Sequence, residues 1–227
     1  THLEKEIKAL EGVLYNPNKP VAAIIGGSKV STKIDVINFL LKKMDIIIIG
    51  GAMANTFVVA KGLDVGTSLF EKECIDLAKE LIEKSQNNNC NIILPTDFIV
   101  SKNLKKNADY TTTNFDLIPH NMMALDIGPK SIELINKNIN NCKTILWNGP
   151  LGAFETYPFD KGTNKVASYV SSLTKQKKIL SVAGGGDTVS ALNNAKVLND
   201  FSYVSTAGGA FLEWLEGKVL PGIEPIS

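Results

Sequence analysis

Six short runs of β-branched and aliphatic residues constrain the fold of this chain more than any other feature of its sequence. They lie at residues 21–26, 45–50, 91–100, 143–149, 178–186 and 202–209, and most of them contain or end in glycine. Because the runs are largely apolar without alternation, they are typical of strands that are buried on both faces. We therefore predict six strands of a mostly parallel sheet.

The segments between these runs have the period of amphipathic helices. Residues 31–44 place Ile34, Ile37 and Leu40 on one stripe, and residues 129–141 repeat the pattern. Buried strands that alternate with such helices predict an α/β fold, a doubly wound (Rossmann-like) six-stranded sheet with helices on both faces. In this architecture a ligand binds outside the carboxyl ends of the strands, which is where the glycines stand.

The pattern divides the chain into a short opening helix and one large domain. Residues 1–12 predict an amphipathic helix whose Thr1 and Glu4 have the spacing of a capping box. Residues 13–227 are enough for one sizeable core, and residues 101–128 predict an excursion of loops and short strands. Since the chain opens without an initiator methionine, we expect it to be a piece of a longer protein.

Composition excludes several classes of partner. A formal net charge of +1 argues against a nucleic-acid or anionic membrane surface, and no apolar stretch approaches the roughly 18 residues of a membrane span. Three cysteines without C-x-x-C spacing support neither a disulfide framework nor a zinc site, so we expect a reducing, cytoplasmic environment. All 24 basic residues are lysine, so no guanidinium fork is present to bind phosphates. We expect a monomer with small-molecule partners.

Two lysines follow the first strand in the stretch "GGSKVSTK". The stretch is not a Walker loop, in which lysine directly follows glycine, and it lacks the G-x-G-x-x-G of NAD-dependent oxidoreductases. If a helix begins near Val30 or Ser31, Lys29 and Lys33 lie on one face of its first turn, where the helix dipole is positive. That arrangement favours a bound anion such as a polyphosphate. The alternative is a pair of solvent-facing lysines in a lysine-rich chain.

Two later strands end in loops suited to phosphate binding. The glycines of "GGGDT", residues 184–188, let backbone amides approach a phosphate, and Thr188 can donate to it. Asp187 is either the N-cap of the next helix or a ligand of phosphate-bound magnesium. In "WNGPLGAFE", Asn148 brings an amide to the sheet edge and Glu155 can accept from ribose hydroxyls. The alternative is that Asn148 only forms a turn and that Glu155 is a surface acid. For each residue taken singly, that role is the more common one.

Seven motifs, taken in order, resemble the phosphoglycerate kinase family. They are "GGSKVSTK", "IIIIGGAMANTF", "GTSLF", "LDIGP", "WNGPLGAFE", "GGGDT" and "VSTAGGAFLEWLEGKVLPG". The resemblance is to the C-terminal nucleotide-binding domain of that family, with residues 1–12 similar to its interdomain helix and its N-terminal domain absent. Ala52 and Ala207 stand where the family often has glycine.

The resemblance implies transfer of a phosphoryl group between 1,3-bisphosphoglycerate and Mg-ADP, giving 3-phosphoglycerate and ATP in glycolysis. It implies that Lys33 contacts the α-phosphate and that Asp187 binds the magnesium ion. It also implies that Lys29, Gly186 and Gly209 are catalytic, with Lys29 neutralising charge on the transferred group. The nucleotide-binding residues that it implies are Gly27, Lys29, Lys33, Gly50, Gly51, Leu125, Asn148, Gly149, Pro150, Ala153, Glu155, Gly185, Gly186, Asp187 and Thr188.

The family's N-terminal domain is the part that binds 3-phosphoglycerate. Because that domain is absent here, we expect the chain alone to bind Mg-ADP or ATP without efficient turnover. The alternative is a stand-alone adenine-nucleotide-binding module with no catalytic role.

Overall fold

The computed structural model describes residues 2–218, with side chains from Lys8 onward, and contains a six-stranded, all-parallel main sheet. Thr1 and the side chain of Glu4, which form the predicted capping box, and residues 219–227 lie outside this description. The strands of the main sheet are β1 (Val21–Ile25), β2 (Ile46–Ile49), β3 (Asn91–Ile93), β7 (Thr144–Asn148), β8 (Leu180–Gly184) and β9 (Tyr203–Ser205).

The strand order of the main sheet is β3-β2-β1-β7-β8-β9, so the chain builds outward from β1 in one direction and then from β7 in the other. The predicted doubly wound fold is confirmed. In such a sheet the ligand crevice lies at the carboxyl ends of the two central strands, where the winding direction reverses. The expected site is therefore at the ends of β1 and β7.

Helices cover both faces of the main sheet, because successive strand residues point to opposite faces. On β1, Ala23 and Ile25 pack into one core, and Ala22 and Ile24 pack into the other. The first face is covered by α1 (His2–Leu14), α2 (Ile34–Leu40), α3 (Met53–Ala60), α4 (Ile75–Asn87) and α8 (Gly208–Leu215). The second is covered by α5 (Pro129–Asn140), α6 (Lys161–Lys175) and α7 (Gly186–Asn194). Three short 3-10 helices complete the chain: η1 (Val30–Thr32), η2 (Lys72–Cys74) and η3 (Leu198–Asp200).

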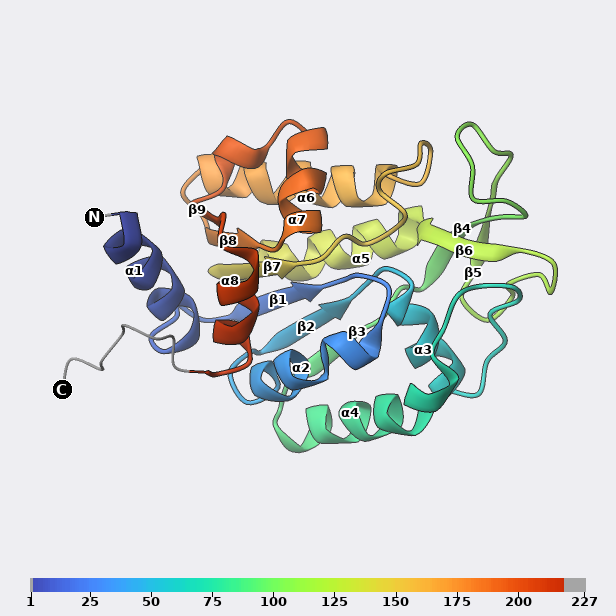
Figure 1. The fold of residues 1–227 in the computed structure, drawn as a ribbon, viewed down its shortest axis with the longest axis horizontal. Helices are drawn as coiled ribbons and strands as arrows, with labels where there is room; N and C mark the ends of the chain where they lie inside the picture. Colours follow the sequence, from blue (N-terminus) through green and yellow to red (C-terminus); the bar gives the residue numbers. More distant parts are fainter. Residues whose placement is uncertain (1, 219–227) are drawn as a thin grey trace.

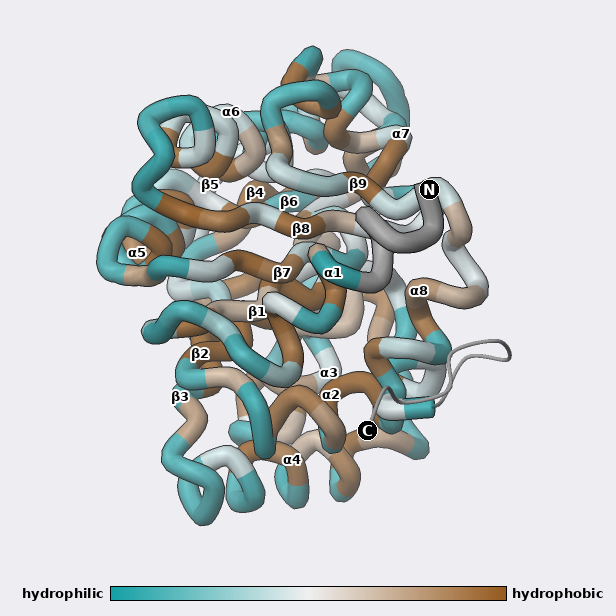
Figure 2. Tube along the Cα trace, turned by 90° about the vertical axis from the view of Figure 1, so that its left-hand side faces the viewer, coloured by the Kyte–Doolittle hydropathy of each residue, from teal (hydrophilic) through white to brown (hydrophobic). Residues whose placement is uncertain are grey.

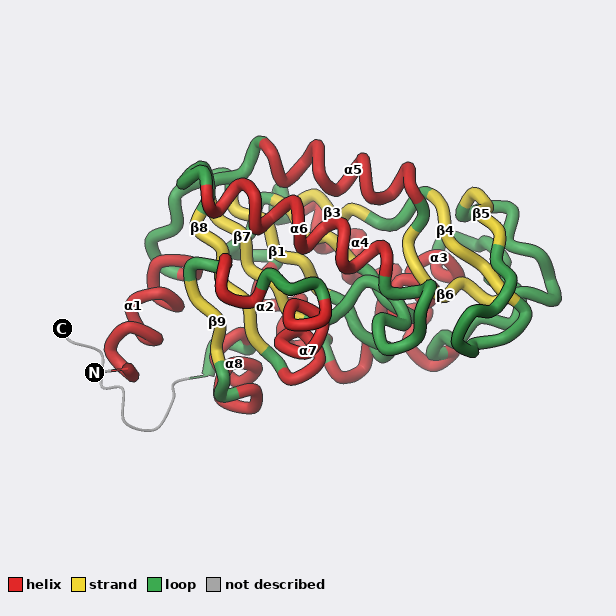
Figure 3. Tube along the Cα trace, turned by 90° about the horizontal axis from the view of Figure 1, so that it is seen from above, coloured by secondary structure: helices red, strands yellow, loops and turns green. Residues whose placement is uncertain are grey.

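The predicted helical stripes face these cores. Ile37 and Leu40 of α2 are fully buried, and Ile135 and Ile139 of α5 are almost fully buried. Figure 2 shows hydrophobic segments along the central strands and hydrophilic ones on the outer loops, and Figure 3 shows α5 and α6 lying over the strands. No helix within residues 2–218 is both long enough and apolar enough to cross a bilayer.

The predicted single strand at residues 91–100 is wrong, because the run divides into two strands that belong to different sheets. The break falls at Pro95, which has no backbone N–H to give to a ladder and restricts the residue before it. After the break the chain forms a three-stranded antiparallel sheet of order β5-β4-β6. Its strands are β4 (Asp97–Ser101), β5 (Thr111–Asn114) and β6 (Met123–Ile127). The predicted excursion is therefore a small sheet, and it lies at the end of the molecule opposite α1 (Figure 1).

The small sheet is fixed to the second helical layer through Asp97 at the start of β4. Its carboxylate accepts hydrogen bonds from the backbone N–H groups of Lys130 and Ser131 at 3.0 and 2.7 Å. These are first-turn amides of α5, which have no partner within the helix. A carboxylate at this position also complements the positive end of the helix dipole. The small sheet therefore takes a defined position beside the main sheet.

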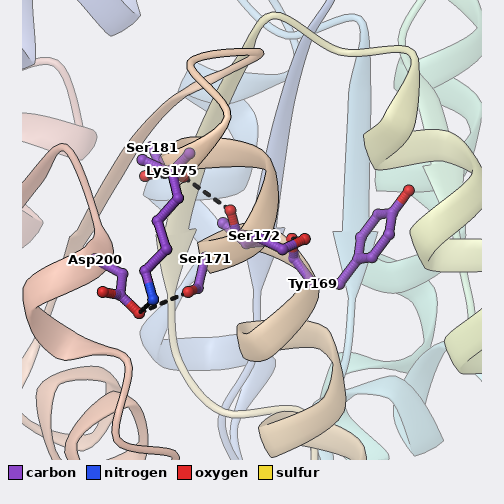
Figure 4. A network of polar contacts seen from close by, with 8 residues as sticks. Tyr169, Ser171, Ser172, Lys175, Ser181 and Asp200 are labelled. Carbon is purple, nitrogen blue, oxygen red and sulfur yellow. Dashed lines mark hydrogen bonds and ion pairs between the residues drawn. The ribbon is translucent and has the colours of Figure 1, made fainter.

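A polar network holds the outer end of α6 against the last strands (Figure 4). Asp200 accepts a hydrogen bond from Ser171 Oγ at 2.7 Å and pairs with Lys175 at 2.8 Å. The hydroxyls of Thr174 and Ser181 lie 2.8 Å apart. The hydrogen bonds from Lys175 and Ser171 hold the pKa of Asp200 below its usual range. The network joins α6 to β8 and η3 on the side of the sheet away from its carboxyl edge.

Three loops at the carboxyl edge of the main sheet are joined by backbone hydrogen bonds. The N–H of Gly26 donates to Asn148 O at 2.9 Å, and the N–H of Gly51 donates to Leu151 O at 3.0 Å. A Cβ on Gly26 would lie 1.9 Å from the carbonyl oxygen of Pro150, which no real contact permits. Position 26 therefore requires glycine, because there is no space for a side chain.

We predict that Gly26→Ala lowers the free energy of unfolding by at least about 2 kcal/mol, because the methyl group must push the β7 loop away. Urea denaturation measures the change. The matched control is Gly12→Ala within α1, where a Cβ meets only Leu180 at 4.0 Å. That variant is expected to be neutral or stabilised by up to about 1 kcal/mol. Equal stability of the two variants would contradict the steric argument.

Candidate functional site

A pocket of about 330 Å³ opens at the carboxyl edge of the main sheet, between the loops of that edge and the small sheet. It is lined by Gly27, Ser28, Gly51, Ala52, Asn55, Leu69, Phe98, Leu104, Met123, Ala124, Leu125, Asp126, Pro150, Leu151, Gly152, Ala153, Phe154, Glu155, Thr156 and Asp187. Seven residues predicted from the sequence are among them: Gly27, Gly51, Leu125, Pro150, Ala153, Glu155 and Asp187.

The two sides of the pocket differ in chemistry. Phe98, Met123 and Leu125 come from the small sheet and are apolar. Glu155 comes from the loop after β7 and Asp187 from the first turn of α7, and both are exposed carboxylates. A pocket with one apolar wall and one polar edge suits a ligand that has a flat apolar body and a charged end.

Gly50 and Gly149 have structural roles at this edge. Gly50 is buried outside the pocket lining, and a Cβ on it would lie 2.3 Å from the Leu151 side chain. Gly149 has a φ of +100°, and a Cβ there would lie 2.2 Å from the Gly26 carbonyl oxygen. Both positions exclude side chains, so the loops after β1 and β7 pack backbone against backbone, and the Leu151 side chain packs directly on the backbone of Gly50.

A hydrogen-bonded cluster beside the pocket contains three of the predicted phosphate-binding residues. Asn148, at the end of β7, is 2% exposed, and its Oδ1 accepts a hydrogen bond from Lys33 Nζ. Its Nδ2 donates to Gly184 O at 2.8 Å. Thr188, which is 1% exposed, accepts from the N–H of Gly149 at 2.7 Å through its Oγ1. The cluster therefore joins the ends of β7 and β8 to the start of α2.

Lys33 is a partly buried cation whose hydrogen-bond acceptor is a neutral amide. Burial lowers the pKa of Lys33, and the negative charge of Asp187 opposes part of that shift. Asp187 lies in the first turn of α7, and within residues 2–218 its carboxylate makes no hydrogen bond or ion pair. The site therefore contains a cation and a carboxylate that both have capacity for a further ligand.

The predicted helix start around Lys29 is wrong in detail. Lys29 is extended, Val30–Thr32 form η1, and α2 begins at Ile34 with Lys33 as its N-cap. The two lysines therefore do not share the first turn of one helix. The side chain of Lys29 is exposed and does not line the pocket, so the structure does not bring it to the cluster around Asn148.

Glu71 already supplies the anion at the start of η1. Its carboxylate accepts from Ser31 N at 3.0 Å and from Ser31 Oγ at 2.5 Å. Burial would raise the pKa of Glu71, but hydrogen bonds from Ser31 and Val30 and the charge of Lys29 hold that pKa below its usual range. These amides are therefore not a free phosphate site. Sequence reasoning missed this residue because it lies 40 positions away in the chain.

The glycines at the starts of α7 and α8 lie side by side. A Cβ on Gly208 would lie 3.7 Å from Gly186 N, so the loops after β8 and β9 are in contact. Gly186 and Gly209 are exposed, and a Cβ on either would meet nothing within 4 Å. Gly185, with a φ of +99°, requires glycine, since a Cβ would lie 2.7 Å from Asn148 Nδ2. Gly186 and Gly209 do not line the pocket, and their catalytic role stays a prediction.

Asp126 is a pocket residue to which sequence reasoning gave no role, although it lies within the quoted motif "LDIGP". It is 3% exposed, and its carboxylate accepts from Ile127 N at 2.8 Å and from Gly162 N at 2.7 Å. Burial raises the pKa of Asp126 to about 8, although both backbone donors lower it. The sequence signal that could have identified Asp126 is an acidic residue within an otherwise apolar strand. The residue ties β6, one wall of the pocket, to the start of α6.

The chain was compared with known proteins, and the phosphoglycerate kinase family model matches residues 1–218. A phosphoglycerate kinase of Sinorhizobium fredii is 52% identical over 222 residues, which is 98% of this chain and 56% of that protein. The chain belongs to the phosphoglycerate kinase family. The recognition made from the motifs is therefore confirmed, and the chain corresponds to the C-terminal part of the family's sequence.

Two solved phosphoglycerate kinases share this fold. The structure from Coxiella burnetii superposes with a TM-score of 0.91 at 44% identity, covering 96% of this chain and 56% of the other. The structure from Pyrococcus horikoshii gives a TM-score of 0.79 at 26% identity, covering 96% and 54%. The chain thus spans a little over half the length of the phosphoglycerate kinases it matches.

The two alanines that depart from the glycines often found in the family fit without strain. Ala52 has a φ of −65° and Ala207 a φ of −95°, which any residue adopts. Ala52 lines the pocket as the N-cap of α3. Neither methyl group therefore requires the loops of this phosphoglycerate kinase chain to move.

We predict that Asp126 makes the folded chain less stable as pH rises. Its folded pKa of about 8 is above the unfolded value near 3.8, so the stability it contributes is full below pH 4 and is lost as pH approaches 8. The free energy of unfolding of the wild type should fall relative to Asp126→Asn by roughly 1 kcal/mol per pH unit.

Urea denaturation of both proteins at pH 5, 6, 7 and 8 measures this difference, in which other titrating groups cancel. If the difference were flat or rose with pH, Asp126 would be ionised in the folded state and held by the amides of Ile127 and Gly162.

Proposed function

We propose that this chain binds Mg-ADP and Mg-ATP and is the nucleotide half of a phosphoglycerate kinase. The observation that carries the proposal is the position of the Lys33–Asn148–Thr188 cluster beside a pocket that has one apolar wall. The base and ribose fit the pocket, with Glu155 at its edge to accept from ribose hydroxyls. The phosphates extend along the ends of β7 and β8.

Lys33 carries the electrostatic part of this proposal. A cation that burial has partly desolvated gains more from a nearby phosphate than a fully hydrated one does. Asn148 orients the ammonium by accepting its hydrogen bond. Thr188 accepts from Gly149 N and so holds the loop after β7, along which the phosphates would lie. The first-turn amides of α7, from Gly186 onward, supply hydrogen-bond donors and a positive dipole end for the same phosphates.

Magnesium fits the donor set of the site. Within residues 2–218 no three His, Cys, Asp or Glu side chains gather to hold a metal ion. Asp187 offers one carboxylate at the pocket edge, and Mg²⁺ is typically held by one or two carboxylates together with phosphate oxygens and water. The ion would neutralise phosphate charge and bridge the phosphates to the protein. Asp187 would hold it.

In the complete family protein the reaction proposed is phosphoryl transfer between 1,3-bisphosphoglycerate and Mg-ADP, giving 3-phosphoglycerate and ATP. Such transfer depends on alignment of the reactants and on positive charge around the moving group. Lys29 and the amides of Gly186 and Gly209, all exposed outside the pocket lining, would act on the transferred group, as the family resemblance implies. We assign 3-phosphoglycerate binding to the part of the family's sequence that this chain does not span.

We predict that the 227-residue chain binds Mg-ADP and that Lys33→Met weakens binding about 10- to 100-fold, because a charged hydrogen bond to phosphate is lost. Isothermal titration calorimetry measures both affinities. The matched control is Lys137→Met, an exposed lysine in the last turn of α5, which should leave affinity unchanged. Equal affinity of Lys33→Met and wild type would remove the main support for the proposal.

A coupled assay with ATP and 3-phosphoglycerate separates the proposed half-enzyme from a complete one. The chain alone should give no turnover above the uncatalysed rate at saturating Mg-ATP. Turnover at an enzyme-like rate would show that the 3-phosphoglycerate site lies within this chain.

A further inference from the structure

Asn55 carries a buried amide oxygen that has no hydrogen-bond partner among residues 2–218. The residue lies in the first turn of α3, is 1% exposed and lines the pocket. Its Nδ2 donates to Leu69 O at 2.9 Å, which fixes the amide and leaves Oδ1 as the unused acceptor. A buried polar atom without a partner is costly, so an unpaired one in a native structure calls for an explanation.

The location of Asn55 supplies that explanation. Asn136 Oδ1 and Asp160 Oδ1 are also buried without a partner within the described residues, but neither residue lines the pocket. Asn55 does, and its neighbours in the lining include Leu69, Phe98 and Leu125. A small number of polar groups in a mostly apolar lining orient and select the ligand of such a pocket, and Asn55 and Asp126 are the buried polar side chains of this lining.

We propose that Asn55 Oδ1 selects the nucleobase by accepting a hydrogen bond from the exocyclic amine of adenine. This inference rests on the proposed function, since it assumes that the base occupies this pocket. Adenine presents an N–H donor at its 6-position, whereas 6-oxo purines present an acceptor oxygen there. An amide oxygen pairs with the first and repels the second, so Asn55 favours adenine over hypoxanthine and guanine.

Asn55 Oδ1 is buried in the structure, so a base can reach it only if a residue at the rim of the pocket moves aside. Leu69 is 61% exposed, and its carbonyl is the group that holds Asn55 Nδ2. Leu69 is the rim residue that the proposal requires to move outward when the base binds.

The first test varies the ligand and leaves the protein unchanged. Calorimetry with magnesium and ADP, inosine diphosphate or purine riboside diphosphate compares an amine, a carbonyl and a hydrogen at the 6-position. ADP should bind about tenfold more tightly than inosine diphosphate, with the unsubstituted purine between them. Equal affinities for the three diphosphates would overturn the role of Asn55. Absence of binding by all three would overturn the proposed function itself.

The second test varies residue 55. Asn55→Leu, close in shape and without an acceptor, should reduce the ADP preference over inosine diphosphate to less than about threefold. Asn55→Asp keeps an acceptor oxygen and should retain the preference. The matched control is Leu104→Ala, an apolar pocket residue whose loss should weaken all three diphosphates alike. A tenfold preference that survives in a folded Asn55→Leu protein would contradict the proposal.

Discussion

Backbone packing between the loops after β1 and β7 is the constraint on which the rest of the structure depends. Gly26 and Gly149 approach so closely that a Cβ on either would lie 1.9 or 2.2 Å from a carbonyl oxygen of the other loop. The parallel pairing of β1 with β7 can continue to the point where the winding reverses only because these side chains are missing. Asn148 lies at this junction, because its carbonyl oxygen accepts a hydrogen bond from Gly26 N and its side chain accepts one from Lys33 Nζ.

A second consequence of this junction is electrostatic. Lys33, at the start of α2, points inward, and its ammonium donates a hydrogen bond to the side-chain oxygen of Asn148. Burial lowers the pKa of Lys33. If stability alone mattered, this cation would have a carboxylate as its hydrogen-bond partner. Glu71 shows such complementary pairing nearby, because its carboxylate accepts from the backbone N–H of Ser31 in η1. The carboxylate that faces Lys33 is Asp187, which acts on it through space and keeps its oxygens available. Because the two charges do not pair with each other, a magnesium nucleotide could interact with both of them.

The sequence predicted the main sheet well and the site in part, for physical reasons that can be named. Buried parallel strands produce apolar runs that end in glycine, so the edge carrying Gly27, Gly51 and Asn148 could be placed without coordinates. The small sheet could not, because short antiparallel strands such as β5 are mostly exposed and carry threonine and asparagine. Glu71 was missed because its partners lie 40 residues away, and a long-range contact of that kind leaves no local pattern.

The two sides of the pocket come from different sheets. This explains why the residues of one side could be predicted from the sequence more completely than those of the other. The phosphates of the proposed nucleotide would meet backbone amides at the ends of main-sheet strands, and glycine spacing marks those positions because glycine lets the backbone approach a ligand closely. The wall proposed to hold the base consists of side chains from β4, β6 and α3, and apolar residues there have the same sequence pattern as core residues. Asn55 is the exception, because a buried amide oxygen without a partner costs free energy that packing does not return. The proposed hydrogen bond from a bound base would offset that cost, and base selection would then explain why the residue is polar.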